Sequence, residues 1–461
     1  MAQTDYDLAV LGAGSAGMAA ARRAASAGLS VVMFERERVG GTCVNRGCVP
    51  KKLLVTASRQ GDAIRGAEPF GWSVAEPSFD WPTLRDAVQD EVRDIGTRQA
   101  ASLEEAGVTL VGERVRLAGD GRIVAAEGDG EWRATDVLLA TGSRPLVPKL
   151  PGGELALVSD DLFTLEALPR RLALVGGGYI AVEFANLMRR FGVEVSIFES
   201  SDHLLDGFDP EIVGHLQDSM TGDGIEIVTG CEVGGIEAHG EGLRRLRIDG
   251  DSDREGFDAV ALVIGRAPNV EDIGLEEAGV RLTEKGQVEV DGYFRTSAEH
   301  VYAAGDVAAK LQLTPVAIEQ GRSAVAAILG ETFDTTREEH VPTGVYSTPE
   351  CGAVGLTEAA ATELGIEHEV RRADFRPLDN VLAGEAENVV IKLVVEKPTG
   401  QLLGFHSFGP HAAESTQLAA LPVSARLTEH DLHRTMALHP THAEEIVSLG
   451  RPDRTFRTGR G

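Results

Sequence analysis

The sequence contains few cysteines, few aromatic residues and no long apolar run. Four of its 461 residues are cysteine and 5% are aromatic. A small secreted domain stapled by disulfides is therefore excluded, because such domains are rich in cysteine. No apolar run approaches the roughly 18 residues that a membrane helix needs, and the N-terminus lacks the basic region of a signal peptide. We expect a chain without a membrane span that works in the reducing cytoplasm.

Basic residues are also scarce relative to acidic ones. There are 44 Lys and Arg against 72 Asp and Glu, which gives a net charge of −28. Such a chain repels nucleic acid and anionic membranes, so neither is expected as a partner. The length predicts about two to four domains.

The segment GGTCVNRGCVPKK, Gly40 to Lys52, holds Cys43 and Cys48 with four residues between them. The loop between them is too short to be a useful staple, and the spacing differs from the CxxC of zinc and thioredoxin-like sites. We interpret the pair as a disulfide that opens and closes chemically; the alternative is two ordinary buried cysteines. If Cys48 begins a helix, the helix dipole and Lys51 would favour its thiolate.

A dinucleotide fingerprint opens the chain. A buried strand at 6–11 is followed by Gly12, Gly14 and Gly17 in the pattern GxGxxG, then by an Ala-rich helix. The next strand ends at Glu35, eighteen residues after the last glycine. Strand, tight turn, helix N-terminus and acid are what a dinucleotide needs for its pyrophosphate and ribose. The alternative is that the glycines only form a turn.

The same pattern occurs a second time. LALVGGGYIAVEFA, which starts at Leu172, carries Gly176, Gly178 and Ala181, and the following strand ends at Glu199. Glu199 again lies eighteen residues past the third small residue. Two such units predict two dinucleotides, most simply FAD and a nicotinamide cofactor.

Three further segments carry candidate roles. TGSRP at 141–145 predicts the crossover into a second domain, and Asp306 in VYAAGDVA could hold a ribityl hydroxyl or simply form a turn. A polar stretch at 331–340 predicts a linker before an α+β region. In ALHPTHAEEIV, His439 could protonate a leaving thiolate, with Glu444 to orient it, or could be an ordinary surface histidine.

GGTCVNRGCVPKK, the two fingerprints, ATGSRP, AAGDVA and ALHPTHAEE, in this order, resemble the flavoprotein disulfide reductases over essentially the whole chain. The CVNRGCVPKK form and the HPTxxEE ending resemble the glutathione reductases, whereas lipoamide dehydrogenases more typically read CLNxGCIPxK and HAHPTxSE. The resemblance implies an α/β fold with two Rossmann-like domains, for FAD and NAD(P), and a C-terminal α+β interface domain. The implied boundaries are 1–142 for FAD, 143–268 for NAD(P), 269–338 for a central domain and 339–461 for the interface.

The resemblance also implies a homodimer in which the histidine serves the disulfide of the other subunit. Cys43 would be the interchange thiol, Cys48 the thiolate that faces the flavin, and His439 the general acid–base oriented by Glu444. Lys51 and Glu183 would pair beside the flavin, and no metal is expected. The implied cofactor-binding residues are Gly12, Gly14, Ser15, Gly17, Glu35, Thr42, Thr141, Gly142, Gly176, Gly178, Tyr179 as a gate, Ile180, Glu199, Gly265, Arg266, Asp306 and Thr314.

The nicotinamide site departs from the NADPH-using glutathione reductases. Ser200 and Asp206 stand where arginines would grip the 2′-phosphate, while Glu199 suits a 2′-hydroxyl and with Asp202 would repel a phosphate. The sequence therefore predicts NADH in preference to NADPH. The alternative is that Arg189 or Arg190 reaches the phosphate in the fold.

The substrate site departs as well. Ser15, Arg22 and Arg322 match the residues that bind glutathione, and an arginine fork suits its carboxylates. Gln99, however, stands where a tyrosine is expected. Gln99 is either an exposed helix position or the sign of a related substrate, so the predicted substrate is oxidised glutathione or a close relative.

Three other kinds of function are alternatives to a glutathione reductase: a lipoamide dehydrogenase, a mercuric or thioredoxin reductase, and a non-catalytic flavoprotein. A lipoamide dehydrogenase would share the acid at Glu199 but should lack the paired arginines. Mercuric and thioredoxin reductases need a further C-terminal cysteine pair, and no cysteine follows Cys351. A non-catalytic flavoprotein would not need the complete set of cysteines, histidine and glutamate. Cys231 and Cys351 are predicted to be ordinary buried or half-buried thiols.

Overall fold

The structure is a computed structural model, and it describes residues 5–75, 77–240, 242–250, 252–333, 340–384, 388–450 and 452–457. Most of the predicted linker lies outside these ranges. The chain forms two compact units. The first combines Met1–Leu53, Thr83–Leu146 and Arg266–Thr336, and the second Leu54–Pro82, Val147–Gly265 and Arg337–Gly461. The predicted four-domain division is finer than these units and stays a prediction.

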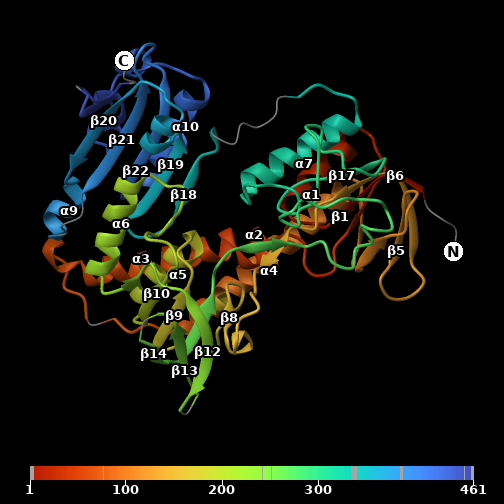
Figure 1. The fold of residues 1–461 in the computed structure, drawn as a ribbon, viewed down its shortest axis with the longest axis horizontal. Coiled ribbons are helices and arrows are strands. Elements are labelled where there is room, and N and C mark those ends of the chain that lie inside the picture. The colour runs from red at the N-terminus through yellow and green to blue at the C-terminus, as the bar shows by residue number, and fades with distance from the viewer. Residues whose placement is uncertain are drawn as a thin grey trace. The chain divides into compact units, whose positions relative to one another are not determined.

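The sheet of the first unit is built around parallel strands in the order β3-β2-β1-β6; Figure 1 labels β1 and β6 of this set. The C-terminal half of β6 pairs with β17, and its N-terminal half continues through antiparallel β5 and β4. The strands predicted at the two ends of the fingerprint are confirmed as β1 and β2. The strands are β1 (Asp5–Leu11), β2 (Val31–Phe34), β3 (Val108–Val111), β4 (Val115–Leu117), β5 (Arg122–Ala125), β6 (Glu131–Leu139) and β17 (Val301–Ala303).

Side chains alternate between the two faces of this sheet. Leu8 and Val10 pack on one face with helices α1 and α7, whereas Ala9 and Leu11 pack on the other with the segment at 273–288. Both faces are buried, which explains why β1 reads as a continuous apolar run. The helices that begin in this unit are α1 (Ser15–Ser26), α2 (Gly41–Arg46), α3 (Cys48–Arg65) and α7 (Thr314–Ile328); α4 (Trp81–Glu105) ends in it.

The second unit contains a parallel sheet in the order β11-β10-β9-β15-β8 and a small antiparallel sheet, β12-β13-β14. Helices α5 (Tyr179–Arg190) and α6 (Pro210–Gly222) follow β9 and β10 along the chain. The strands predicted around the second fingerprint are confirmed. The bounds are β8 (Leu157–Val158), β9 (Arg171–Val175), β10 (Glu194–Phe198), β11 (Glu226–Val228), β12 (Val233–His239), β13 (Leu243–Ile248), β14 (Arg254–Phe257) and β15 (Ala259–Leu262).

The C-terminal part of the second unit is an antiparallel sheet in the order β18-β19-β22-β21-β20-β23, covered on one face by α10 (Figure 1). This is the predicted α+β region. The elements are β18 (Thr343–Val345), β19 (Glu350–Gly355), α8 (Glu358–Glu363), β20 (His368–Phe375), α9 (Leu378–Ala383), β21 (Val389–Glu396), β22 (Leu402–Gly409), α10 (Ala412–Ser424), α11 (Glu429–His433), α12 (Glu444–Ser448) and β23 (Arg454–Phe456).

A buried ion pair joins α6 to this antiparallel sheet. Asp209 caps α6 by accepting a hydrogen bond from the Glu211 backbone N–H, and Lys392 on β21 donates to the same carboxylate at 2.8 and 3.1 Å. The side chains of Lys392 and Asp209 are 3% and 0% exposed, and Glu358 lies 2.9 Å from the same ammonium. A lysine so deeply buried stays charged only with such partners.

The two fingerprints have nearly the same backbone geometry. Gly12 and Gly176 have φ of +108° and +116°, and a Cβ added to either would lie 2.3 or 2.7 Å from the carbonyl oxygen that follows the adjacent strand. Gly14 and Gly178 are the N-caps of α1 and α5, both with extended backbone. Only glycine permits these positive φ values together with the close approach.

The third position of the first fingerprint tolerates no side chain. A Cβ on Gly17 would lie 2.0 Å from the Gly12 carbonyl oxygen and 3.1 Å from Cγ1 of Val10. We therefore expect Gly17→Ala to lower the free energy of unfolding by about 1–3 kcal/mol through overpacking, measured as a fall in the thermal midpoint. Gly214→Ala is the control, because no described heavy atom lies within 4 Å of the added Cβ in α6. It should leave the midpoint unchanged or raise it; equal midpoints for both variants would contradict the expectation.

Candidate functional site

The predicted catalytic residues are divided between the units. Cys43, Cys48 and Lys51 lie in the first, and His439 and Glu444 lie in the second. Glu183 and Tyr179, the predicted partner of Lys51 and the predicted gate, also lie in the second unit. The Lys51–Glu183 pair stays a prediction.

The two candidate redox cysteines lie on consecutive helices of the first unit. Cys43 is in α2, and Cys48 is the first residue of α3, as the sequence predicts. A Cβ on Gly47, between them, would lie 2.8 Å from the Thr42 carbonyl oxygen and 3.2 Å from Cys43 Cα. The glycine thus lets the chain fold back tightly after α2. Both cysteines are thiols in this structure, half-buried at Cys43 and exposed at Cys48.

The surroundings distinguish the two thiols. A hydrogen bond with Cys48, followed by burial, raises the pKa of the Cys43 thiol. Cys48 Sγ lies 3.6 Å from the hydroxyl oxygen of Thr314, which begins α7, and its position at the start of α3 places it at the positive end of a helix dipole. Cys43 therefore retains its proton more strongly than an ordinary thiol and needs a base to become a nucleophile.

The first fingerprint fits the phosphates and ribose of a dinucleotide such as FAD. The helix α1 begins at Ser15 after Gly14, and no side chain of the described residues caps it, so its first N–H groups are open to an anion. Glu35 follows β2, and its carboxylate accepts hydrogen bonds from the backbone N–H groups of Ala13 and Glu37, both at 2.9 Å. These bonds hold the acid beside the glycine turn, with remaining lone pairs for a ribose hydroxyl.

Predicted FAD residues are joined by a hydrogen-bond chain within the first unit. Ser143 donates to the Asp306 carboxylate at 2.7 Å and accepts from Arg266 Nε at 2.8 Å. The Arg266 guanidinium also donates to the Ser143 carbonyl oxygen at 2.8 Å and to the Thr42 hydroxyl at 3.3 Å. Sequence reasoning missed Ser143 as a connecting residue, although it lies inside the TGSRP motif.

The crossover segments pair with each other. Strands β7 (Ser143–Pro145) and β16 (Arg266–Pro268) form a two-stranded antiparallel sheet. Thr141 donates to the Asn269 carbonyl oxygen at 2.7 Å, and the Asn269 amide donates back at 2.9 Å, while its backbone N–H bonds the Gly142 carbonyl oxygen. Of the predicted cofactor residues in these segments, Thr141, Gly142 and Arg266 therefore lie together in the first unit, whereas Gly265 belongs to the second. Gly265 precedes Arg266 with φ of +124°.

In the second fingerprint the acid lies directly against the glycine turn. Glu199 Oε1 accepts from the Ser201 backbone N–H at 2.7 Å and from the Ser200 hydroxyl at 3.1 Å. A Cβ on Gly177 would lie 2.7 Å from Glu199 Oε2. The Leu205 backbone N–H bonds the Gly177 carbonyl oxygen at 2.9 Å, which docks the loop after β10 on the turn. Again no described side chain caps the helix, α5, whose first residues are Tyr179 and Ile180.

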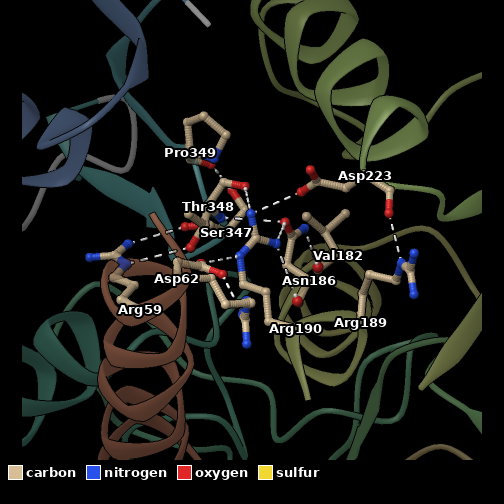
Figure 2. Close-up of polar contacts among 11 residues, drawn as sticks. Arg59, Asp62, Val182, Asn186, Arg189, Arg190, Asp223, Ser347, Thr348 and Pro349 are labelled. Carbon is tan, nitrogen blue, oxygen red and sulfur yellow. Dashed lines mark hydrogen bonds and ion pairs between the residues drawn. The ribbon is translucent and has the colours of Figure 1, made fainter. Parts of the chain in front are cut away.

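Arg189 and Arg190 are held at the far end of α5. Figure 2 shows Arg190 between the carboxylates of Asp62 and Asp223, at 2.8 and 2.9 Å, with a further bond to the Thr348 carbonyl oxygen at 2.9 Å. Arg189 donates to the backbone carbonyl oxygen of Asp223 at 2.7 Å. A helix of this length spans about 18 Å, and the glycine turn is at its other end. The alternative that these arginines bind a 2′-phosphate gains no support from this arrangement.

Glu183 lies on α5, one turn from Tyr179. Glu183 is 3% exposed and accepts a hydrogen bond from the Tyr346 backbone N–H at 2.8 Å, whereas Tyr179 is 42% exposed. The exposure of Tyr179 at the start of the helix is compatible with a movable gate. The contact with Tyr346 could not be read from the sequence, because the two residues are far apart in the chain.

The predicted histidine–glutamate pair is formed. His439 Nδ1 lies 3.1 and 3.0 Å from the two carboxylate oxygens of Glu444, at the start of α12. The His439 side chain is 79% exposed and that of Glu444 is 19% exposed. The carboxylate therefore orients the ring so that Nε2 can exchange a proton with a group outside this unit.

The predicted substrate residues lie in the first unit. Arg22 is on α1 and Arg322 on α7, two helices that pack together where Gly321 meets the Ala16 backbone. Among the described residues neither guanidinium has an acidic partner, so both are available to an anion. Gln99 on α4 is not a fully exposed position: its Oε1 is buried and has no partner among the described residues. The alternative that Gln99 is simply an exposed helix position is therefore wrong.

The other two cysteines are buried. Cys231 and Cys351 are 8% and 0% exposed, which confirms the prediction of ordinary buried thiols, and burial raises the pKa of Cys351. Within the part of the chain that the structure describes, no helix is long and apolar enough to cross a membrane. The same residues contain no group of three or more His, Cys, Asp or Glu placed to hold a metal ion.

Comparison with protein families gives two matches that cover most of the chain. Residues 6–321 match the model described as pyridine nucleotide-disulphide oxidoreductase. Residues 341–449 match the dimerisation domain described for pyridine nucleotide-disulphide oxidoreductases. Together with the two parallel sheets and the C-terminal antiparallel sheet, these matches confirm the predicted fold class.

Several curated proteins are similar over nearly their full length. A glutathione reductase of Burkholderia cepacia is 39% identical over 449 residues, which cover 97% of this chain and 99% of the relative. A glutathione reductase of Nostoc sp. is 38% identical, with 96% and 99% covered. A thioredoxin reductase of Emiliania huxleyi is 33% identical, with 98% and 97% covered.

Proposed function

Because the chain belongs to the pyridine nucleotide-disulphide oxidoreductases, we propose that it reduces a low-molecular-weight disulfide, oxidised glutathione or a close relative, with electrons from NADH. The observation that carries this proposal is the thiol pair formed by Cys43 in α2 and Cys48 at the start of α3, in the unit that holds the first fingerprint. The relatives named as glutathione reductases support the substrate class. The guanidinium groups of Arg22 and Arg322, which have no acidic partner in the part of the chain that the structure describes, suit its carboxylates.

The overall reaction converts one disulfide, NADH and a proton into two thiols and NAD⁺. FAD, when bound, supplies the two-electron transfer between the nicotinamide and the protein's sulfur atoms. Cys43, as a thiolate, attacks one sulfur of the substrate and releases the first thiol, which leaves a mixed disulfide on Cys43. Cys48 then attacks Cys43 Sγ, releases the second thiol and closes the Cys43–Cys48 disulfide.

His439 supplies the proton transfers in this scheme. It accepts the proton of Cys43, whose raised pKa calls for a base, and returns it to the first leaving thiolate. Glu444 fixes the ring through Nδ1 and stabilises the imidazolium while it holds the proton. We place this histidine on the partner subunit of a homodimer, a proposal that the match to the dimerisation domain supports. A cytoplasmic location also belongs to the proposal.

FAD is assigned to the first fingerprint, and the nicotinamide cofactor to the second. Gly12, Gly14, Gly17 and Glu35 would hold the adenosine diphosphate part of FAD, and the Asp306–Ser143–Arg266–Thr42 chain its ribityl and pyrophosphate groups. The residues proposed for the nicotinamide cofactor are Gly176, Gly178, Tyr179, Ile180 and Glu199.

The preference for NADH rests on the charge around Glu199. Its carboxylate lies against Gly177, and the loop ESSDHLLD that it begins contains no Lys or Arg. Asp202 and Asp206 are exposed in the same loop. A ribose hydroxyl can donate to Glu199, whereas a 2′-phosphate would bring about two negative charges to three carboxylates.

The test is steady-state reduction of oxidised glutathione by the FAD-loaded protein with either nucleotide. We expect kcat/KM to be at least about tenfold higher with NADH, which corresponds to about 1.4 kcal/mol. The variant Glu199→Ala with Ser200→Arg should narrow this ratio by improving the use of NADPH. Faster turnover with NADPH in the wild type would contradict the cofactor assignment and leave the reductase intact. Activity with dihydrolipoamide but not with glutathione disulfide would instead favour a lipoamide dehydrogenase.

A further inference from the structure

Asn45 lies between the two redox cysteines and binds the turn that precedes them. Its amide Nδ2 lies 3.1 Å from the Arg38 carbonyl oxygen, 3.4 Å from that of Val39 and 3.0 Å from that of Gly41. The residue is 7% exposed. One buried side chain therefore holds three carbonyl groups of the turn at 38–41, directly before and at the start of α2.

The orientation of this amide is imposed by its partners. All three neighbours are carbonyl oxygens, so the NH₂ group must face them. The other end of the amide, Asn45 Oδ1, is buried and has no hydrogen-bond partner among the described residues. A buried acceptor without a donor is costly, which indicates that the three bonds to the turn determine how Asn45 is placed.

The same turn is docked on the first fingerprint. The Gly40 backbone N–H donates to the Ala13 carbonyl oxygen at 2.9 Å. A Cβ on Gly41, whose φ is +59°, would lie 2.6 Å from Gly14 Cα. Asn45 thus holds from one side a turn that the fingerprint holds from the other, and α2 with Cys43 begins inside that turn.

We propose that Asn45 is a positioning residue for the Cys43–Cys48 couple. By fixing the start of α2 against the fingerprint, it limits the positions of Cys43 Sγ relative to Cys48 and raises the effective concentration of one thiol at the other. A higher effective concentration favours the intramolecular disulfide over the dithiol. The inference rests on the proposed redox role of the pair.

The equilibrium that reports this effect can be written with glutathione. One thiol of the pair attacks oxidised glutathione, which forms a mixed disulfide and releases one glutathione. The other thiol then attacks the protein sulfur, closes the Cys43–Cys48 bond and releases a second glutathione. Two protein thiols are oxidised and one glutathione disulfide is reduced to two thiols. Only the ring-closing step depends on the effective concentration.

The experiment equilibrates the FAD-loaded protein without oxygen in glutathione buffers of graded ratio, then alkylates free thiols and quantifies Cys43 and Cys48 by mass spectrometry. For Asn45→Ala we expect the equilibrium constant for disulfide formation to fall about tenfold, a potential about 30 mV less negative. Asn45→Ser should shift it less, because a hydroxyl can still donate to the Gly41 carbonyl four residues earlier. Arg46→Gln, which removes a half-exposed ion pair with Glu37 from the same helix, is the matched control and should match the wild type.

The outcomes separate the two proposals. Wild-type constants in both Asn45 variants overturn the inference, and so does a lower thermal midpoint with an unchanged constant, since Asn45 would then be merely structural. If Asn45→Ala does not fold, Asn45→Ser decides by the same criterion. A wild type that forms no Cys43–Cys48 disulfide in any buffer contradicts the proposed function and this inference together. A wild-type disulfide with unshifted variants contradicts only the inference.

Discussion

Replacing Cys43 by serine is expected to abolish disulfide reduction, with kcat lowered by about a thousandfold or more. A serine hydroxyl cannot exchange with a substrate disulfide, and Cys48 alone cannot close a ring to release the second thiol. The measurement is NADH consumption in the presence of oxidised glutathione. Cys43 is half-buried, and the change of sulfur to oxygen is small, so the fold should be retained.

Two comparisons make this result specific. Cys351→Ser replaces a thiol that is 0% exposed and should leave turnover within a few-fold of the wild type, whatever it costs in stability. The Cys43→Ser protein should still oxidise NADH with ferricyanide, an acceptor that does not need the thiol pair. If Cys43→Ser kept substantial glutathione-dependent turnover, the assigned nucleophile would be wrong and a non-catalytic role for the pair would regain weight.

His439→Gln is the second large effect, with an expected loss of kcat of about a hundredfold or more. Glutamine can still bond Glu444, but it can neither take the proton of Cys43 nor return one to the leaving thiol. Because the His439 side chain is 79% exposed, little stability should be lost. The measurement is kcat with oxidised glutathione, together with the thermal midpoint.

The chain offers a matched control in His300. Its Nδ1 lies 2.9 Å from the Asp136 carboxylate, and its side chain is 57% exposed, so it repeats the chemistry of the His439–Glu444 pair at another place. His300→Gln should leave kcat unchanged. Equal activities of the two variants would mean that His439 is an ordinary surface histidine. A lower midpoint in His439→Gln with normal kcat would lead to the same conclusion.

Local pattern was enough to predict the elements that carry the site. The glycine spacing and the acids at Glu35 and Glu199 located both fingerprints, and the helix considered at Cys48 is present as α3. The contact between His439 and Glu444 was also predictable, because only five residues separate them. In each case the residues belong to one local motif, so their separation in the sequence predicts how they are arranged in space.

Long-range contacts were not predictable from the sequence. The backbone N–H of Tyr346 meets Glu183 from another part of the chain, and Arg266 reaches Thr42 across more than two hundred residues. Asn45 was visible inside the cysteine motif, but the three carbonyl groups that it binds depend on how the preceding turn folds back. The spacing of buried polar residues along the chain does not predict which distant groups they will bond.

The pair between Lys392 and Asp209 makes ionic strength act unevenly on this protein. Salt screens exposed charges beyond a Debye length of about 8 Å at physiological strength, so it relieves the mutual repulsion of a surface with a net charge of −28. The pair between α6 and β21 is shut away from mobile ions, with side chains 3% and 0% exposed. Added salt therefore weakens the repulsion between surface charges that opposes folding, while it hardly screens the attraction between Lys392 and Asp209.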